Sequence, residues 1–500
     1  MLAHHRISMP SLSLARPAVH LLALIVALIA APAPIRAQEA GDAAASAAIA
    51  RIRDEGLNRS RVLELYSHLT DVIGPRLTAS PAYRQAADWA SERFSEWGLA
   101  DARLEPFEFG RGWTLDALTL EMTAPRYFPL IGYPEAWTPS TDGAITGTPV
   151  YIGDRTAEQI AAMRDRLRGA IVLATAPQTE FITEDRQQPS DTEDRVPIGA
   201  PRMLRSESAM PIRDLMTLLQ EAGAAAVLRP NQGQHGTVFV LGNRNTPDDA
   251  VPSVILAAEH YNTIVRMLQQ DVPVTLRVRV DARYHEADTN GYNVLAEIPG
   301  TDLAEEVVLV GAHLDSWHSS PGATDNADGV VAVMEAARIL STLDRPRRTI
   351  RFALWGGEEQ GLLGARAYAE RHLAGDANAQ ARDRLYVYLN DDPGTGATYG
   401  FYMQEDTAAM AVFDAWLSPL RDLGFRRNVI DPIGSTDHLA FTRIDVPAFN
   451  TLKDYVDYDV RTHHTNTDFF ERSSEQDLKQ SAIVLAVAAW QAAHRGESLR

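Results

Sequence analysis

The sequence predicts an α/β fold, with a mixed, mostly parallel central sheet, helices on both faces and a small inserted α/β domain. Short, mostly apolar segments alternate with segments of helical length between residues 307 and 494. Strands that are apolar along their whole length are typical of parallel sheets buried on both faces. A second alternation of strands and helices occupies residues 148–273, and it predicts the inserted domain.

The elements of the main sheet follow from the first alternation. The predicted strands are Val307–Val310, Ile350–Leu354, Leu385–Leu389 and Ala448–Leu452. The predicted helices are Gly329–Leu343, Gly361–His372, Asp406–Leu423 and Glu475–His494. Because helices separate the successive strands, we expect most neighbouring strands in this sheet to run parallel.

The N-terminal half supplies the rest of the main domain and the insert. Spaced apolar positions in Ser80–Trp97 predict an amphipathic helix, with Gly98 as its C-cap. Alternating apolar residues predict strands within residues 102–123, and strict alternation in Val274–Arg283 marks the return of strands after the insert. The predicted boundaries are therefore 38–125 for the first part of the main domain, 126–273 for the insert, and 274–500 for the remainder.

Residues 1–37 have the layout of a secretory signal peptide. Arg6 and Arg16 precede and flank an apolar run from Leu21 to Ala31, and the small residue Ala37 offers a cleavage point before Gln38. The run is shorter than the roughly 20 apolar residues that span a bilayer, so we expect no stable membrane insertion. Export to a periplasmic or extracellular compartment is the prediction.

Composition excludes several classes of protein. The chain has 500 residues and no Cys, so disulfide scaffolds, iron–sulfur proteins and thiol enzymes are excluded. With 47 Lys and Arg against 66 Asp and Glu, it lacks the basic excess of a nucleic-acid-binding protein. Any metal chemistry must therefore use His, Asp and Glu.

Residues of those three types stand at three predicted strand ends, at one helix start and in one late loop. The candidates are His313 and Asp315, Asp325, Glu358 and Glu359, Asp391 and Asp392, and His463 and His464. Because ligands of open α/β sheets bind at the carboxyl ends of the strands, we expect these side chains to gather at one edge. Taken together, they indicate a metal site built from carboxylates and imidazoles.

Four motifs resemble those of the co-catalytic di-zinc exopeptidases of the bacterial leucyl aminopeptidase type. They are His-Leu-Asp-Ser (313–316), Gly-Ala-Thr-Asp-Asn-Ala-Asp-Gly (322–329), Trp-Gly-Gly-Glu-Glu-Gln-Gly (355–361) and His-Thr-Asn-Thr-Asp (464–468). The order and combination look most similar to the branch that includes plasma glutamate carboxypeptidase, which has an inserted protease-associated domain. The resemblance covers most of the chain after residue 37. It implies a zinc exopeptidase fold and hydrolysis of peptide or dipeptide substrates.

The resemblance also implies a role for each residue of the site. His313 and Asp392 would bind one Zn²⁺, Glu359 and His464 a second, and Asp325 would bridge the two. Asp315 would accept the other N–H of the His313 imidazole and fix its tautomer. Glu358 would be the general base, taking a proton from the attacking water and delivering it to the departing amine.

Several local assignments are choices between neighbours. Asp392 is preferred to Asp391 because the following Pro-Gly-Thr aligns with the family's Asp-Ala-Gly-Thr. His464 is preferred to His463 because the family's ligand directly precedes Ser or Thr. Asp437, in a Gly-Ser-Thr-Asp-His segment, is either a residue of the substrate-side wall or part of a turn and helix cap. His318 is expected to be a surface residue.

Two other functions remain open from the sequence. A glutaminyl cyclase-like acyltransferase would use a single zinc, and the presence of both His313 and Asp392 argues against it. A non-catalytic, receptor-like binding protein would have lost ligands, whereas every expected ligand and the base are present. The sequence leaves open aminopeptidase, carboxypeptidase or dipeptidase specificity, and also a homodimer, which relatives with an inserted domain often form.

Overall fold

The computed structural model describes residues 33–186, 210–392, 394–497 and 499. The chain divides into two compact units, residues 1–51 and 52–500. Helix α2 (Ala33–Asn58) begins in the first unit and ends in the second. Most of the predicted signal peptide lies outside the described residues. Within the described residues, no helix combines the length and the apolar character needed to span a bilayer.

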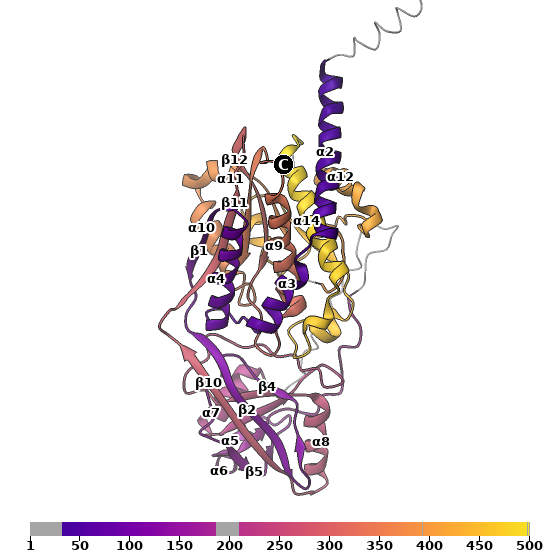
Figure 1. The fold of residues 1–500 in the computed structure, drawn as a ribbon. Helices are drawn as coiled ribbons and strands as arrows, with labels where there is room; N and C mark the ends of the chain where they lie inside the picture. The colour runs from indigo at the N-terminus through magenta and orange to yellow at the C-terminus, as the bar shows by residue number, and fades with distance from the viewer. Residues whose placement is uncertain (1–32, 187–209, 393, 498, 500) are drawn as a thin grey trace, which may run out of the picture. The chain divides into compact units, whose positions relative to one another are not determined.

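A seven-stranded sheet forms the centre of the main domain (Figure 1). Its strands, from one edge to the other, are β1 (Ala100–Glu108), β11 (Asn290–Ile298), β13 (Arg348–Trp355), β12 (Leu303–His313), β14 (Leu385–Asn390), β16 (Ala448–Lys453) and β15 (Thr398–Tyr402). The four central strands run parallel, while β1, β11 and β15 add antiparallel edges. The mixed α/β sheet expected from the sequence is confirmed, with its parallel part confined to the centre.

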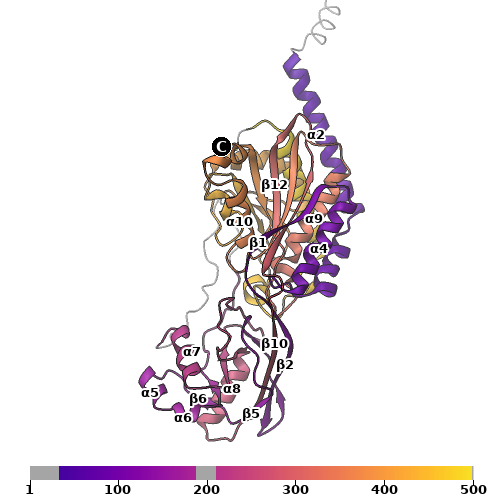
Figure 2. The same ribbon diagram turned by 90° about the vertical axis from the view of Figure 1, so that its left-hand side faces the viewer.

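Helices cover both faces of this sheet, and Figure 2 shows α9 and α10 on opposite sides of it. The helices of the main domain are α3 (Val62–Ser67), α4 (Pro81–Glu96), α9 (Asp328–Ser341), α10 (Leu363–His372), α11 (Ala379–Arg384), α12 (Thr407–Leu417), α13 (Leu439–Thr442) and α14 (Glu475–His494). Helix α14 is buried at every residue from Gln480 to Ala493, which agrees with its apolar character on all sides.

The insert has its own sheets and core. A five-stranded sheet has the order β4 (Gly132–Pro134), β9 (Ser253–Leu256), β8 (Ala226–Pro230), β7 (Ile171–Leu173) and β6 (Val150–Tyr151). Its helices are α5 (Ala157–Ala161), α6 (Arg164–Leu167), α7 (Ile212–Glu221) and α8 (Ala258–Gln269). A second sheet has the order β3 (Phe128–Pro129), β2 (Gly112–Ala124), β10 (Thr275–His285) and β5 (Ile145–Gly147).

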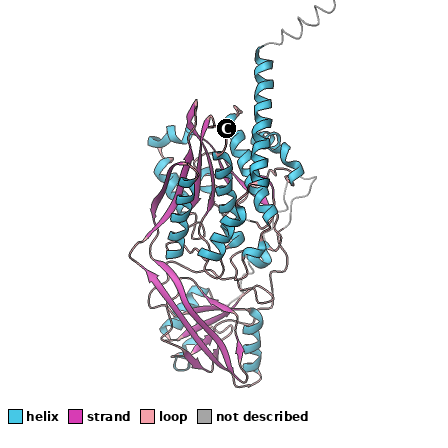
Figure 3. Ribbon diagram, viewed as in Figure 1, coloured by secondary structure: helices cyan, strands magenta, loops and turns pink. Residues whose placement is uncertain are grey.

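The long strands β2 and β10 join the insert to the main domain (Figure 3). Leu120 and Met122 of β2, with Leu276 and Val278 of β10, pack in one apolar cluster with residues of the five-stranded sheet and α8, including Leu256. The packing unit of the insert therefore extends on both sides beyond residues 126–273. The predicted boundaries mark where composition changes along the chain.

The strands predicted for the main sheet lie inside β12, β13, β14 and β16. Strand β15 was not among the predicted strands. The predicted helix Asp406–Leu423 is only partly correct, because α12 ends at Leu417 and a 3₁₀ turn, Ser418–Leu423, follows it. Pro419 lies in that turn and cannot donate the backbone hydrogen bond that a continuing α-helix needs.

Candidate metal centre

The carboxyl ends of the three neighbouring parallel strands bring the predicted site residues together. His313 is the last residue of β12 and pairs with Trp355, the last residue of β13. Glu358 and Glu359 follow β13, and Asp391 and Asp392 follow β14. Since the strands are in parallel register, their C-terminal residues reach the same edge of the sheet, as the sequence predicts.

Asp325 reaches this edge from a distorted turn. Residues Ala323–Ala327 form one irregular helical turn before α9, and Asp325 itself has non-helical φ and ψ angles. Asp468 fixes the turn, since its carboxylate accepts the backbone N–H of Thr324 at 2.9 Å and that of Asp325 at 3.1 Å. Gly322 has a φ of +62°, and a β-carbon there would lie 2.4 Å from Cβ of Ser316. Only glycine fits that position.

The two oxygens of Asp325 face two different imidazoles. Asp325 Oδ1 lies 3.2 Å from Nε2 of His313, and Oδ2 lies 3.2 Å from Nε2 of His464. Asp392 approaches the first imidazole at 3.6 Å, and Glu359 approaches the second at 2.9 Å. The five proposed ligands therefore form two groups that share only Asp325, which is the arrangement that a bridging carboxylate gives to two cations.

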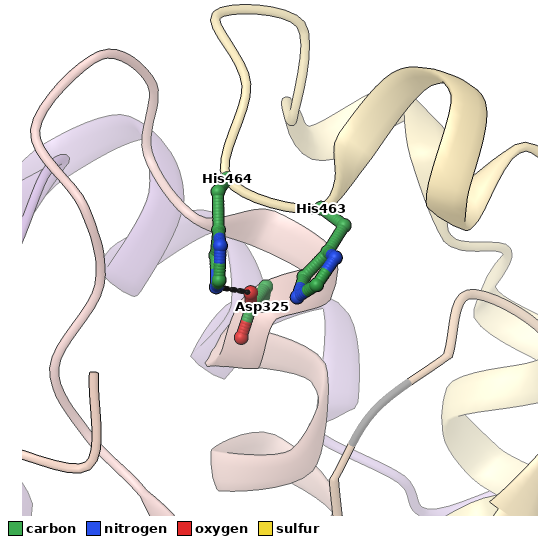
Figure 4. Close-up of side chains that lie close together, drawn as sticks. All are labelled: Asp325, His463 and His464. Atoms are coloured by element: carbon green, nitrogen blue, oxygen red, sulfur yellow. Dashed lines mark ion pairs between the residues drawn. The ribbon is translucent and has the colours of Figure 1, made fainter. Parts of the chain in front are cut away.

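His463 and His464 both point toward Asp325 (Figure 4). His463 stacks on Tyr458, with ring centroids 4.9 Å apart, and burial lowers its pKa to about 3. His464 contacts both Glu359 and Asp325; burial opposes its protonation, but the two carboxylates outweigh burial and raise its pKa to about 10. The contacts with two proposed ligands support His464 as the metal-binding imidazole.

Asp315 supports the site with both its backbone and its side chain. The Nδ1 atom of His313 lies 3.0 Å from the backbone carbonyl oxygen of Asp315 and 3.6 Å from its carboxylate. The carbonyl, and not the carboxylate expected from the sequence, is thus the nearer acceptor for that N–H. The carboxylate accepts the Thr78 hydroxyl at 3.0 Å and the backbone N–H of Glu358 and Glu359 at 3.2 and 3.3 Å. Asp315 thereby joins the ends of β12 and β13.

Several carboxyl groups are buried together in the site, and their burial disfavours the charged form. Burial raises the pKa of Glu358 well above its usual range, and the nearby Asp392 and Asp437 carboxylates add to the increase. Burial likewise raises the pKa of Glu359 to about 7. Oε1 of Glu359 and Oδ2 of Asp325 are buried without a hydrogen-bond partner among the described residues. Such a cluster of acceptors fits cations.

Asp391 and Asp392, which follow β14, differ in the residues that they contact. Asp391 accepts the Thr451 hydroxyl at 2.5 Å and lies 3.2 Å from the buried ammonium of Lys453. Lys453 also lies 3.3 Å from Asp328. Because Asp391 is neutralised by Lys453 while Asp392 faces His313, the contacts support Asp392 as the ligand and Asp391 as a structural acid.

Asp437 and His318 occupy different surroundings. Asp437 is 1% exposed, and neither carboxylate oxygen has a hydrogen-bond partner among the described residues. Burial raises its pKa well above the usual range.

The prediction that His318 is a surface residue is wrong: its Nε2 lies 2.7 Å from the carbonyl oxygen of Pro134, and its ring packs edge-on against Trp113. The contacts of His318 link the loop after His313 to residues around the insert.

Arg76 is a supporting residue that the sequence did not reveal. It is fully buried and donates to the backbone carbonyls of Leu314 at 2.9 Å, Pro321 at 2.6 Å and Gly322 at 3.1 Å. The segment between the ligands His313 and Asp325 is therefore held from inside by one guanidinium. No local motif marks Arg76, since its three partners in this segment lie more than 200 residues away in the sequence.

The comparison with protein families matches the part of the chain that contains the proposed ligands. Residues 293–489 match the model of Peptidase family M28, a range that contains all five proposed ligands. Over these residues the chain is similar to peptidase family M28. Human carboxypeptidase Q is 24% identical over 455 residues, covering 90% of this chain and 89% of the human protein. A probable lipoprotein aminopeptidase, LpqL of Mycobacterium tuberculosis, is 28% identical over 260 residues, covering 51% of this chain and 48% of that protein.

Solved structures of M28 peptidases share the fold. A peptidase M28 precursor from Shewanella amazonensis superimposes with a TM-score of 0.69 at 24% identity, covering 92% of this chain and 99% of that one. BSAP, a zinc aminopeptidase from Bacillus subtilis, superimposes with a TM-score of 0.58 at 20% identity, covering 88% and 96% of the two chains. These similarities extend over the insert as well as the M28 domain.

Proposed function

We propose that the chain is a zinc-dependent exopeptidase that hydrolyses peptide bonds near a free terminus. The observation that carries the proposal is the Asp325 carboxylate, whose two oxygens each lie 3.2 Å from a different imidazole. The M28 family match and the relatives, which include carboxypeptidase Q and aminopeptidases, support a peptidase that acts at chain ends.

The residues fit two zinc ions. His313, Asp392 and Asp325 would hold one ion, and His464, Glu359 and Asp325 the other. Imidazole nitrogen and carboxylate oxygen are zinc donors, and the buried unpartnered oxygens of Glu359 and Asp325 supply free lone pairs. Bound zinc ions would lower the pKa of a water molecule toward neutrality and polarise the scissile carbonyl.

Glu358 is proposed to move the proton of the reaction. It follows β13 next to the ligand Glu359, and its backbone N–H bonds to Asp315, so the end of that strand fixes its place. Burial raises the pKa of its carboxyl group, which makes the group a stronger base. Glu358 takes a proton from the attacking water and delivers it to the departing amine.

Metal removal and substrate choice test this proposal. The protein is assayed on aminoacyl, carboxypeptidase and dipeptide substrates before and after dialysis against a chelator, and again after zinc is restored. We expect activity on at least one of these classes, its loss with the metal, and its recovery with zinc, because the proposed ligands surround the reacting groups. Full activity in metal-free protein would overturn the proposal.

Zinc stoichiometry separates the proposal from the single-zinc acyltransferase. Two equivalents per chain are expected, because His313 and Asp392 complete a second ligand group beside the one that contains His464. One equivalent, together with cyclisation of an N-terminal glutamine, would support the acyltransferase instead.

We also propose export of the chain through its N-terminal signal peptide. The support is the apolar run Leu21–Ala31 with flanking arginines, and the Mycobacterium tuberculosis relative is named a lipoprotein. A homodimer stays a prediction that rests on the family resemblance alone.

A further inference from the structure

The inserted domain contacts the loop that carries His464 through several segments, and two of them hold its left-handed residues. We call residues 457–466 the ligand loop, because they include this proposed metal ligand. The first contacting segment is Asp185–Arg186, here called the arm, and the second is Val238–Val240, here called the strap. The arm and the strap lie within the insert, more than 200 residues before the ligand loop in the sequence.

The ligand loop contains two residues in the left-handed backbone region. Asp457, before the turn Tyr458–Thr462, and His464 both have a φ of +58°. Neither is glycine, so the β-carbon of each crowds its own backbone, and such residues persist only where surrounding contacts hold them. The source of those contacts is therefore important for the position of the His464 imidazole.

The arm holds the first of these residues. The Asp185 carboxylate accepts the backbone N–H of Asp457 at 2.8 Å, of Asp459 at 2.9 Å and of Val460 at 3.1 Å. Arg186 donates to both oxygens of Asp459, at 2.6 Å from Nη2 and 2.9 Å from Nε. The Asp459 side chain is only 5% exposed, so this two-point ion pair is shielded from water. The Arg186 guanidinium also lies 4.6 Å above the ring of Tyr455.

The strap holds His464, the second left-handed residue of the ligand loop. The backbone N–H of Val240 donates to the carbonyl oxygen of His464 at 3.1 Å. The backbone N–H of Asn466 donates to the carbonyl oxygen of Val238 at 3.1 Å, and its side-chain Oδ1 accepts the Val238 N–H at 2.6 Å. Between them, the ring of Phe239 lies 5.6 Å from the His464 imidazole. Each left-handed residue of the ligand loop thus has a hydrogen bond to the insert.

We propose that the inserted domain positions the metal ligand His464, through the arm at one end of the ligand loop and the strap at the other. This inference rests on the proposed function, because it assigns His464 to a metal centre. Asp185 and Arg186 are positioning residues, because they act on His464 through their bonds to the ligand loop. The insert and the M28 domain therefore form one catalytic unit.

The test compares zinc binding and backbone exchange in variants of the arm. The variants are Arg186→Ala, Arg186→Lys and Asp185→Ala, and the matched control is Arg164→Ala. Arg164 also lies in the insert, but its guanidinium donates to the carbonyl oxygen of Glu221 and not to the ligand loop. Zinc affinity is measured by competition with a chelator, and hydrogen–deuterium exchange is followed by mass spectrometry on metal-free full-length protein.

We expect Arg186→Ala and Asp185→Ala to lower the affinity for one of the two zinc ions by about 10- to 100-fold. This is the usual effect of removing a residue that orients a ligand. The other ion should bind as in the unaltered protein, and amides of residues 457–466 should exchange faster. Arg186→Lys keeps the positive charge but loses the two-point geometry. Its zinc affinity should therefore lie between that of Arg186→Ala and that of the unaltered protein. Arg164→Ala should match the unaltered protein.

The exchange measurement separates this inference from the proposed function. If the unaltered protein binds no zinc but the loop exchanges faster in the arm variants, the proposed function fails and the arm still positions the loop. If all arm variants keep both the exchange pattern and both zinc affinities, the inference is overturned. Exchange in α8 reports whether the insert is folded. Should the alanine variants unfold it, Arg186→Lys decides, and unaltered zinc affinity in that variant counts against the inference.

Discussion

The proposed function of Glu358 depends on the two oxygen atoms of its carboxyl group. Its carboxyl group must accept and release a proton, whereas the adjacent Glu359 must keep its oxygens free for a cation. The two residues follow the same strand, and Asp315 accepts both of their backbone N–H groups. The side chain of Glu359 is set apart by its contact with Nε2 of His464 at 2.9 Å.

Replacing Glu358 by Gln should separate catalysis from metal binding. The amide has the size of the carboxyl group but cannot take the proton, so kcat should fall by about 10²- to 10⁴-fold or more. Zinc content should stay unchanged, because Glu358 is not one of the proposed ligands. Steady-state kinetics and metal analysis measure the two effects. Glu370→Gln, at an exposed position of α10, is the control, and unchanged turnover in Glu358→Gln would contradict the assignment.

The sequence predicted the site residues that lie in recognisable motifs. It missed residues whose hydrogen bonds reach segments far away in the sequence. His313, Asp325 and Asp392 could be chosen because each follows a strand or precedes a helix within a recognisable motif. Asp468 was visible only as part of such a motif, while its bond to the turn of Asp325 required the structure. Arg76 has no local signal, because a buried arginine that bonds only backbone carbonyls looks like any other arginine in the sequence.

Among the elements, β1 and α10 are joined by a buried acid. Glu105 of β1 lies 3.0 Å from Nε2 of His372 and 3.1 Å from Arg371, both in the last turn of α10. Burial acts to raise the pKa of Glu105, but the hydrogen bond and charge of His372, with help from Arg371, lower it overall. The ionised form of Glu105 therefore stabilises this strand–helix contact.

Glu105→Gln should lower the free energy of unfolding by about 1 kcal/mol at neutral pH, a value reduced for the exposure of its partners. A carboxyl group with a lowered folded-state pKa stabilises the protein fully above its ordinary value of 4.5 and loses this contribution as pH falls through the folded-state value. The difference between the two proteins should hence shrink below about pH 4. Urea unfolding at several pH values measures it, with Glu108→Gln, exposed on the same strand, as control.

Strands with a continuous apolar run were predicted correctly, whereas a strand interrupted by glycine was missed. Strands β12, β13 and β14 are apolar runs followed by polar residues, and their positions were correct. Strand β15 contains Gly400, which weakens a strand pattern, yet a β-carbon there would lie 1.8 Å from the carbonyl oxygen of Arg427. The close approach of another segment, which sequence patterns do not show, explains why this strand needs a glycine.

For the whole molecule, the composition bears on how the fold is stabilised. The chain has no Cys, so a large core, including α14 with its buried residues Gln480–Ala493, provides stability without cross-links. The first unit carries the predicted signal peptide, and the second carries the M28 domain together with its insert.

Expression with the native N-terminus in a bacterial host should yield a shortened exported protein. Mass spectrometry of the exported form is expected to give an N-terminus at Gln38, because Ala37 is the small residue after the apolar run. Replacing Leu24 and Ile25 by Arg should block the cleavage. A full-length protein that starts at Met1 and stays with membranes would show an anchor instead.

The sequence positions of Arg76, of the loop after His313 and of His464 set the order in which these parts of the site are made. Arg76 is made early, the ligands of the first group are made next, and His464, Asp468 and α14 come last. A nascent chain therefore contains His313, Asp325 and Asp392 before it contains the residues that complete the second group. The proposed second ligand group is therefore complete only after the end of the chain has been made.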